Sequence, residues 1–133
     1  MARATPAPIC PCGSGQPLND CCGRCHQGSP AATAEALMRS RYSAYVLGLE
    51  DYLLATWHPD TRPAALNLHD QEPRPTWLGL QVRRFEQTGP DTALVEFVAR
   101  YRVGGRAHRL LETSRFERLG GLWVYRDGEF PAA

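Results

Sequence analysis

The five cysteines of this 133-residue chain all lie between positions 10 and 25, and none follows. A disulfide framework usually spreads its cysteines so that bridges join distant segments, and it is typical of secreted chains. In a reducing compartment, clustered thiols are more often metal ligands than disulfides. A short segment rich in glycine and proline also cannot bury a core of its own, so it needs a metal to fold. The sequence therefore indicates a metal-binding segment rather than disulfides or free thiols.

The spacing of the cysteines fits four thiolate ligands around one zinc ion. A Cys-Pro-Cys pair is followed by Gly-Ser-Gly, and a short segment then leads to a Cys-Cys pair. Four thiolates close a tetrahedral zinc site and leave no position for water, so the metal would be structural rather than catalytic. We expect one zinc per chain, which iron could replace in cells, held by Cys10, Cys12, Cys21 and Cys22.

Two residues just after the Cys-Cys pair leave the fourth ligand open. Cys25 and His26 each carry a side chain that binds zinc, so either could replace Cys22. If Cys22 is the fourth ligand, as the family resemblance described next implies, Cys25 would be a spare thiol beside the site.

This pattern resembles the SEC-C motif, a small metal-binding module at the C-terminus of the SecA translocation ATPase. The resemblance covers residues 9–23 and implies the same four cysteine ligands. SEC-C modules usually carry lysines and a tyrosine between the cysteine pairs, whereas this chain has Gln16, Pro17 and Leu18 there. Since the SecA module contacts a chaperone and the ribosome, the resemblance implies a protein or ribosome partner.

Beyond the cysteines, the chain first shows a helical period. Ser29-Pro30 predicts a helix start, and Gly48 predicts its end. Apolar residues at spacings of three and four define one face, whereas Arg39, Arg41 and Ser43 fall mostly elsewhere. A second short helix is expected over 50–57, followed by a proline-rich loop over 59–75. The apolar face comprises Met38, Tyr42, Tyr45, Val46 and Leu49.

From Thr76 onward the period of the pattern changes to two, which is typical of half-buried strands. Gly104-Gly105 and Gly120-Gly121 predict tight hairpin turns between successive strands. The result is a four-stranded antiparallel meander with helices on one face, an α+β architecture. We expect two parts: a cysteine module (residues 1–28) and an α+β domain (residues 29–133). The strands are expected over 77–88, 93–103, 106–119 and 122–126.

A second resemblance spans nearly the whole chain. Three blocks in order, ALMRSRYSAY at 36–45, YLLATWHP at 52–59 and ETSRF at 112–116, are similar to the YchJ-like family of bacterial proteins. The resemblance implies a nuclear transport factor two-like, or cystatin-like, cone: a helical hairpin resting on a curved antiparallel sheet. It implies a fold and a metal, but no established activity.

Folds of this type often enclose a ligand, so a few polar and aromatic residues of the cone (residues 29–133) are candidates for lining a pocket. Alternation places His108, Glu112 and Ser114 on one face of the third strand, where His108 and Glu112 could act as an acid and base couple. Trp57 and His58 could lie at the pocket mouth. No nucleophile pattern accompanies them, and a hydrogen-bonded polar lining explains them as well, so the sequence favours a non-enzymatic role.

Charge and hydropathy narrow the class of protein further. Fifteen basic residues against fourteen acidic ones give a formal net charge of +1, so there is no strong nucleic-acid signature. No segment is apolar enough to span a bilayer, and residues 1–8 lack the apolar run of a secretory signal. We therefore expect a cytoplasmic zinc-binding accessory or interaction protein. The alternative is a small-molecule-binding or enzymatic cone with an interior pocket.

Overall fold

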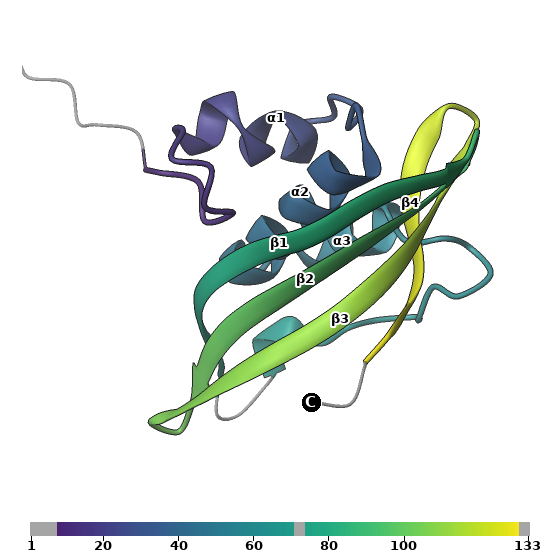
Figure 1. The fold of residues 1–133 in the computed structure, drawn as a ribbon. Coiled ribbons are helices and arrows are strands. Elements are labelled where there is room, and N and C mark those ends of the chain that lie inside the picture. Colours follow the sequence, from purple (N-terminus) through teal and green to yellow (C-terminus); the bar gives the residue numbers. More distant parts are fainter. Residues whose placement is uncertain (1–7, 71–73, 131–133) are drawn as a thin grey trace, which may run out of the picture.

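The computed structural model describes residues 8–70 and 74–130 of the chain (Figure 1). The expected parts, residues 1–28 and 29–133, each extend beyond the described residues at one end. Of residues 1–8, which were expected to carry no secretory signal, only residue 8 is described. Helices come first and strands follow. In order, the elements are η1 (Leu18–Asp20), α1 (Cys22–His26), α2 (Ala34–Leu47), α3 (Glu50–Ala55), η2 (Leu68–Asp70), β1 (Thr76–Gly89), β2 (Thr92–Val103), β3 (Arg106–Leu119) and β4 (Leu122–Glu129).

The four strands form one antiparallel sheet in the order β1-β2-β3-β4, which confirms the expected meander. Gly-Gly pairs close two of its three hairpins, β2–β3 and β3–β4. Gly104 and Gly105 have φ angles of 58° and 79°, and Gly120 and Gly121 have 56° and 83°. A two-residue turn with positive φ at both positions matches the twist of the flanking strands, and glycine adopts it without steric cost.

The long helix α2 starts later than the sequence predicts. Its N-cap is Thr33, whose side chain accepts a hydrogen bond from the Ala36 N–H at 3.1 Å, whereas Ser29-Pro30 lies in the irregular segment before the helix. A threonine hydroxyl at this position satisfies an amide that the first helical turn leaves unpaired. The predicted end is confirmed, since Gly48 caps α2 in the left-handed conformation with φ 74°.

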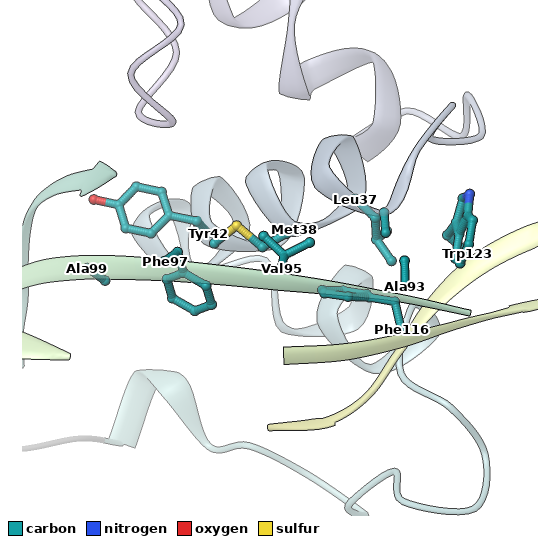
Figure 2. Packing of buried hydrophobic residues seen from close by; sticks show 10 residues of the cluster. Leu37, Met38, Tyr42, Ala93, Val95, Phe97, Ala99, Phe116 and Trp123 are labelled. Carbon is teal, nitrogen blue, oxygen red and sulfur yellow. The ribbon is translucent and has the colours of Figure 1, made fainter. Parts of the chain in front are cut away.

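Helix α2 packs on the inner face of the sheet and makes the main core. Figure 2 shows α2 side chains meeting strand residues between the two layers. Each large apolar side chain buried here contributes about 1.5–3 kcal/mol relative to an exposed one. The buried cluster comprises Ala34, Leu37, Met38, Tyr42, Ala93, Val95, Phe97, Ala99, Phe116 and Trp123.

The described part of the cysteine module lies against α2, on top of the helical layer in Figure 1. The Arg39 guanidinium donates to the Cys12 carbonyl at 3.0 Å, and the His26 ring hydrogen-bonds the Ser40 carbonyl at 2.8 Å. Helix α2 is therefore enclosed by the sheet, by α3 and by the module.

Burial of α2 on several sides corrects one expectation about its polar residues. Ser43 is fully buried and Arg41 is nearly so, although the apolar spacing placed both mostly off the packed face. A single apolar face predicts contact with one layer, and here the helix has neighbours on other faces too.

Among the described residues, no helix combines the length and the apolar character needed to cross a lipid bilayer.

Candidate metal centre and interior cavity

The structure brings the sulfurs of Cys10, Cys12, Cys21 and Cys22 together within 4.8 Å of one another. The Cys12 and Cys21 sulfurs are 3.6 Å apart, and the Cys21 and Cys22 sulfurs are 4.0 Å apart. A tetrahedral zinc ion with Zn–S bonds of about 2.3 Å would separate its sulfurs by about 3.8 Å. The spacing of the four side chains therefore fits a tetrahedral metal ion.

A compact loop aims the first two cysteines at the second pair. The Cys10 N–H donates to the Gln16 carbonyl at 2.8 Å, which closes the loop around Gly13 and Gly15. Both glycines have positive φ, 87° and 80°, a conformation that other residues rarely adopt. The two positions of the loop that require a positive φ are therefore both occupied by glycine.

The 3-10 turn η1 then returns the chain to the loop. Cys21 follows directly, and its N–H donates to the Leu18 carbonyl at 3.0 Å. A Cβ atom at Gly23 would lie 2.6 Å from that same carbonyl oxygen, so only glycine fits there. This close approach places Cys21 and Cys22 opposite the loop.

Most of the cysteine cluster is shielded from water. Cys10, Cys12 and Cys22 are buried, and Cys21 is half-buried. A hydrogen bond from the Cys22 thiol lowers the pKa of Cys12 to about 4, although burial opposes that shift. The same bond, together with burial, raises the pKa of Cys22. Of Cys12 and Cys22, Cys12 is therefore the one disposed to be a thiolate before a metal binds.

Polar groups surround the sulfurs. The Ser14 hydroxyl donates to the Cys21 sulfur at 3.2 Å, and the Ser43 hydroxyl lies 3.5 Å from the Cys10 sulfur. The Arg39 guanidinium approaches through the Cys12 carbonyl, so a positive charge lies close to the cluster. Such outer contacts orient thiolate ligands and stabilise their negative charge.

The two alternative ligands lie outside the group of four. The His26 ring faces α2 and meets the Tyr52 ring edge-on, with centroids 4.8 Å apart. Cys25 is half-buried, and burial raises the pKa of its thiol. In this arrangement His26 serves as a packing and hydrogen-bonding residue between α1 and α2.

An interior cavity of about 270 Å³ lies between α2 and the sheet. Its walls are mostly aromatic and aliphatic, with one arginine and one glutamate among them. The lining residues are Met38, Arg41, Tyr42, Tyr45, Trp57, Trp77, Phe97, Ala99, Leu110, Glu112, Phe116 and Tyr125.

Three of the five candidate pocket residues come together at this cavity. Trp57 and Glu112 line it, and the Ser114 hydroxyl donates to the Glu112 carboxylate at 2.5 Å. The Tyr125 hydroxyl donates to the same carboxylate oxygen at 3.2 Å. Alternation along β3 thus identified a real polar group on the inner face of the sheet.

The two candidate histidines lie elsewhere. His108 is exposed and stacks on Tyr101, with ring centroids 5.2 Å apart. His58 is buried beside β4: its Nε2 lies 3.0 Å from the Glu117 carboxylate, and its Nδ1 accepts the Asp60 N–H at 3.0 Å. His58 thereby fastens the segment after α3 to the sheet, and the structure does not bring His108 to Glu112.

Sequence reasoning missed Arg41 as a cavity residue. Its position is three residues after Met38 and four before Tyr45, both of which line the cavity. Helical spacing therefore contained the signal, but an arginine is so rarely buried that its charge argued against it.

Comparisons with known proteins agree with this architecture. The family model described as "YchJ, middle NTF2-like domain" matches residues 33–128. A UPF0225 protein of Chromobacterium violaceum is 58% identical over 123 residues, which cover 90% of each chain. A UPF0225 protein of Xanthomonas campestris is 56% identical over 128 residues, which cover 96% of this chain and 98% of that one.

Two solved structures share the fold. A SEC-C motif containing protein from Rhodopseudomonas palustris has a TM-score of 0.82 and 36% identity, covering 94% of this chain and 100% of that chain. A sec-c motif containing protein from Psychrobacter arcticus has a TM-score of 0.74 and 26% identity, covering 94% and 84% respectively. With its NTF2-like layer of α2 and four strands and its N-terminal cysteine cluster, the chain belongs to the YchJ-like (UPF0225) family.

Proposed function

We propose that this protein is a zinc-binding accessory protein whose metal is structural. The observation that carries the proposal is the sulfur geometry: four cysteine sulfurs within 4.8 Å of one another, at separations that suit a tetrahedral ion. Zinc is the first choice because thiolates favour it and its site needs no redox partner, and iron is the alternative occupant in cells. The ligands would be Cys10, Cys12, Cys21 and Cys22, one ion per chain.

A metal held by four thiolates has no vacant position for water or substrate. The ligands also give the metal much negative charge, which makes it a poor Lewis acid. The metal would instead supply folding energy, since structural zinc contributes about 10–16 kcal/mol of apparent binding free energy in small modules. The closed coordination supports a non-enzymatic role for the metal centre. The cysteine module would fold only when it binds its metal, and it would then pack against the cone.

The finer proposal is that the metal-bound module docks to a protein or ribosome partner in the cytoplasm. Its surface offers an apolar contact, because Ile9 is 61% exposed, and Arg24 of the same module is also exposed. Contact sites between proteins combine apolar side chains with arginines, and both kinds of side chain are exposed on the module. The likeness to SEC-C motif proteins supports the same role.

Metal analysis and capture experiments test this proposal together. Freshly purified, reduced protein should contain about one zinc per chain, and less than about half an equivalent would contradict the metal assignment. Tagged wild-type protein should capture a specific partner from native lysate, whereas Cys10→Ser should lose both metal and partner. Cys25→Ser is the matched control, because it removes a thiol of the same segment that lies outside the cluster. Capture that survives in the metal-free Cys10→Ser protein would contradict docking through the module.

A second candidate function, a small-molecule-binding or enzymatic cone, is favoured by the cavity between α2 and the sheet. Ligand sites are typically concave, mainly apolar and equipped with a few polar groups, and this cavity has that composition.

A further inference from the structure

The cavity carries two buried groups of opposite charge. Arg41 on α2 is 5% exposed, and Glu112 on β3 is 8% exposed. Burying a charge is costly unless an ion pair or hydrogen bonds compensate it. Among the ion pairs of the described residues, none joins Arg41 to Glu112, although both line the same cavity.

Only one guanidinium nitrogen of Arg41, Nη1, donates hydrogen bonds to the described residues. Its Nη1 donates to the Leu53 carbonyl and to the Thr56 hydroxyl, both at 2.7 Å. Its guanidinium carbon lies 5.0 Å from the Trp57 ring centroid and 4.7 Å from that of Tyr125. A guanidinium has five N–H donors, and those on Nε and Nη2 have no partner among the described residues. Because Arg41 lines the cavity, these donors are available to a molecule that enters it.

Glu112 shows the complementary arrangement. Its Oε2 accepts hydrogen bonds from Ser114 and Tyr125, and Oε1 has no partner among the described residues. Gly128 on β4 packs directly against the carboxylate, so a side chain there would collide with it. The carboxylate is thus positioned by its neighbours, with one oxygen left to accept.

The remaining walls suit a flat, mainly apolar molecule. Seven aromatic side chains line the cavity, together with Met38, Ala99 and Leu110. The volume of about 270 Å³ is below the roughly 300–1,000 Å³ of pockets that hold drug-sized ligands. The ligand would therefore be fragment-sized. Because the charges of Arg41 and Glu112 cancel, a ligand with a net charge would add an uncompensated charge to a buried site.

We propose that the cavity binds a small, planar, net-neutral aromatic or heteroaromatic amide, with its carbonyl accepting from Arg41 and its N–H donating to Glu112. Such a group satisfies a donor and an acceptor at once, and its ring stacks against the aromatic walls. The inference rests on the second candidate function, the small-molecule-binding cone, and it is independent of the metal proposal.

The test uses full-length metal-loaded protein and four probes of one ring size. These are benzamide, benzoate, benzylamine and toluene, each titrated by protein-observed NMR. Benzamide should bind at least about tenfold more tightly than each of the other three, since toluene lacks both hydrogen bonds, and benzoate and benzylamine each lack one and add a charge. Equal affinity for toluene and benzamide would overturn the assigned chemistry while leaving an apolar binding cavity in place.

Two variants locate the probe. Ala99→Leu places extra volume in the cavity and should abolish benzamide binding. Glu112→Gln keeps the shape but removes the charge, and it should weaken benzamide by about fivefold or more and reduce its preference over benzoate. Glu86→Gln, on an exposed stretch of β1, is the control and should change nothing. Metal content is measured in every sample, so loss of the metal is separated from loss of the ligand.

Each remaining outcome is decisive. Benzamide binding that persists unchanged in both Ala99→Leu and Glu112→Gln would place the probe elsewhere and overturn the proposal. Failure of all four probes to bind the wild-type protein at millimolar concentration would overturn both this inference and the small-molecule-binding cone, and would leave the metal proposal intact.

Discussion

Residues 8–28 contain one 3-10 turn and one five-residue helix, whereas residues 76–129 contain four strands of 8 to 14 residues. Most of the buried apolar residues of the cone form one cluster between α2 and the sheet. In the cysteine module the buried cluster consists of cysteines, with Leu18 and Leu80 packed beside it.

This difference shows two ways for a short chain to hold its shape. The cone buries apolar area along regular elements, so its stability is distributed over many contacts. The module has too little apolar area for that, and under the proposed function a single metal ion bound by both cysteine pairs would hold it together. The cone should therefore stay folded when a single contact is lost, whereas the module should unfold when its metal is lost.

The largest expected effect comes from removing the cross-link. Chelation, or Cys12→Ser, should release the metal and expose the amides of residues 8–28, because in the proposed function a structural metal supplies the folding free energy of the module. Hydrogen exchange should show fast exchange there and continued protection in β2 and β3. Cys25→Ser should behave like wild type. Cooperative melting of the whole protein on chelation would refute the division into two parts.

Truncating a large buried side chain of the cone should lower the free energy of unfolding substantially, although by less than metal removal destabilises the module. Phe116→Ala removes a fully buried ring from the main cluster, and the free energy of unfolding should fall by about 3–5 kcal/mol. Chemical denaturation with retained metal content measures this. Phe85→Ala is the matched control, since Phe85 is 38% exposed on β1 and should cost much less. Equal losses for the two variants would contradict the assigned core.

Gly128→Ala tests the close packing of β4 against the interior carboxylate. The added methyl group would collide with Glu112, so stability should fall by about 1–3 kcal/mol. Gly79→Ala is the control, because a Cβ there meets no atom within 4 Å. Thermal unfolding of both variants distinguishes them, and a neutral Gly128→Ala would show that the carboxylate moves freely.

The smallest expected effect lies at the junction of the two regions. Ser43→Ala removes the hydroxyl 3.5 Å from the Cys10 sulfur and should cost about 0.5–1.5 kcal/mol. The loss should appear in metal-loaded protein and shrink after chelation, since the contact exists only when the module is in place. An identical loss in both states would mean that Ser43 stabilises the cone alone.

Local patterns in the sequence were enough to predict much of this molecule. Cysteine spacing grouped the four residues that the structure brings together, and the Gly-Gly pairs marked two of the three hairpins. These signals succeed because each depends on residues close in sequence. Alternation likewise identified Glu112 as an inward residue of β3.

The rest depended on contacts between distant segments. His108 shares the alternation of Glu112, yet it is exposed, because alternation predicts a face of the sheet and not how much of it is covered. The start of α2 fell at Thr33 rather than Ser29-Pro30, since several residues in this stretch can cap a helix. The burial of Arg41 depends on acceptors supplied by Leu53 and Thr56, which a helical pattern does not contain.

The most direct test of the central claim is X-ray absorption at the metal edge of the purified, reduced protein. A structural zinc held by the four clustered cysteines predicts four sulfur neighbours at about 2.3 Å and no oxygen or nitrogen bound to the metal. An exchangeable water, or a nitrogen from His26 in place of one sulfur, would contradict the closed four-cysteine centre.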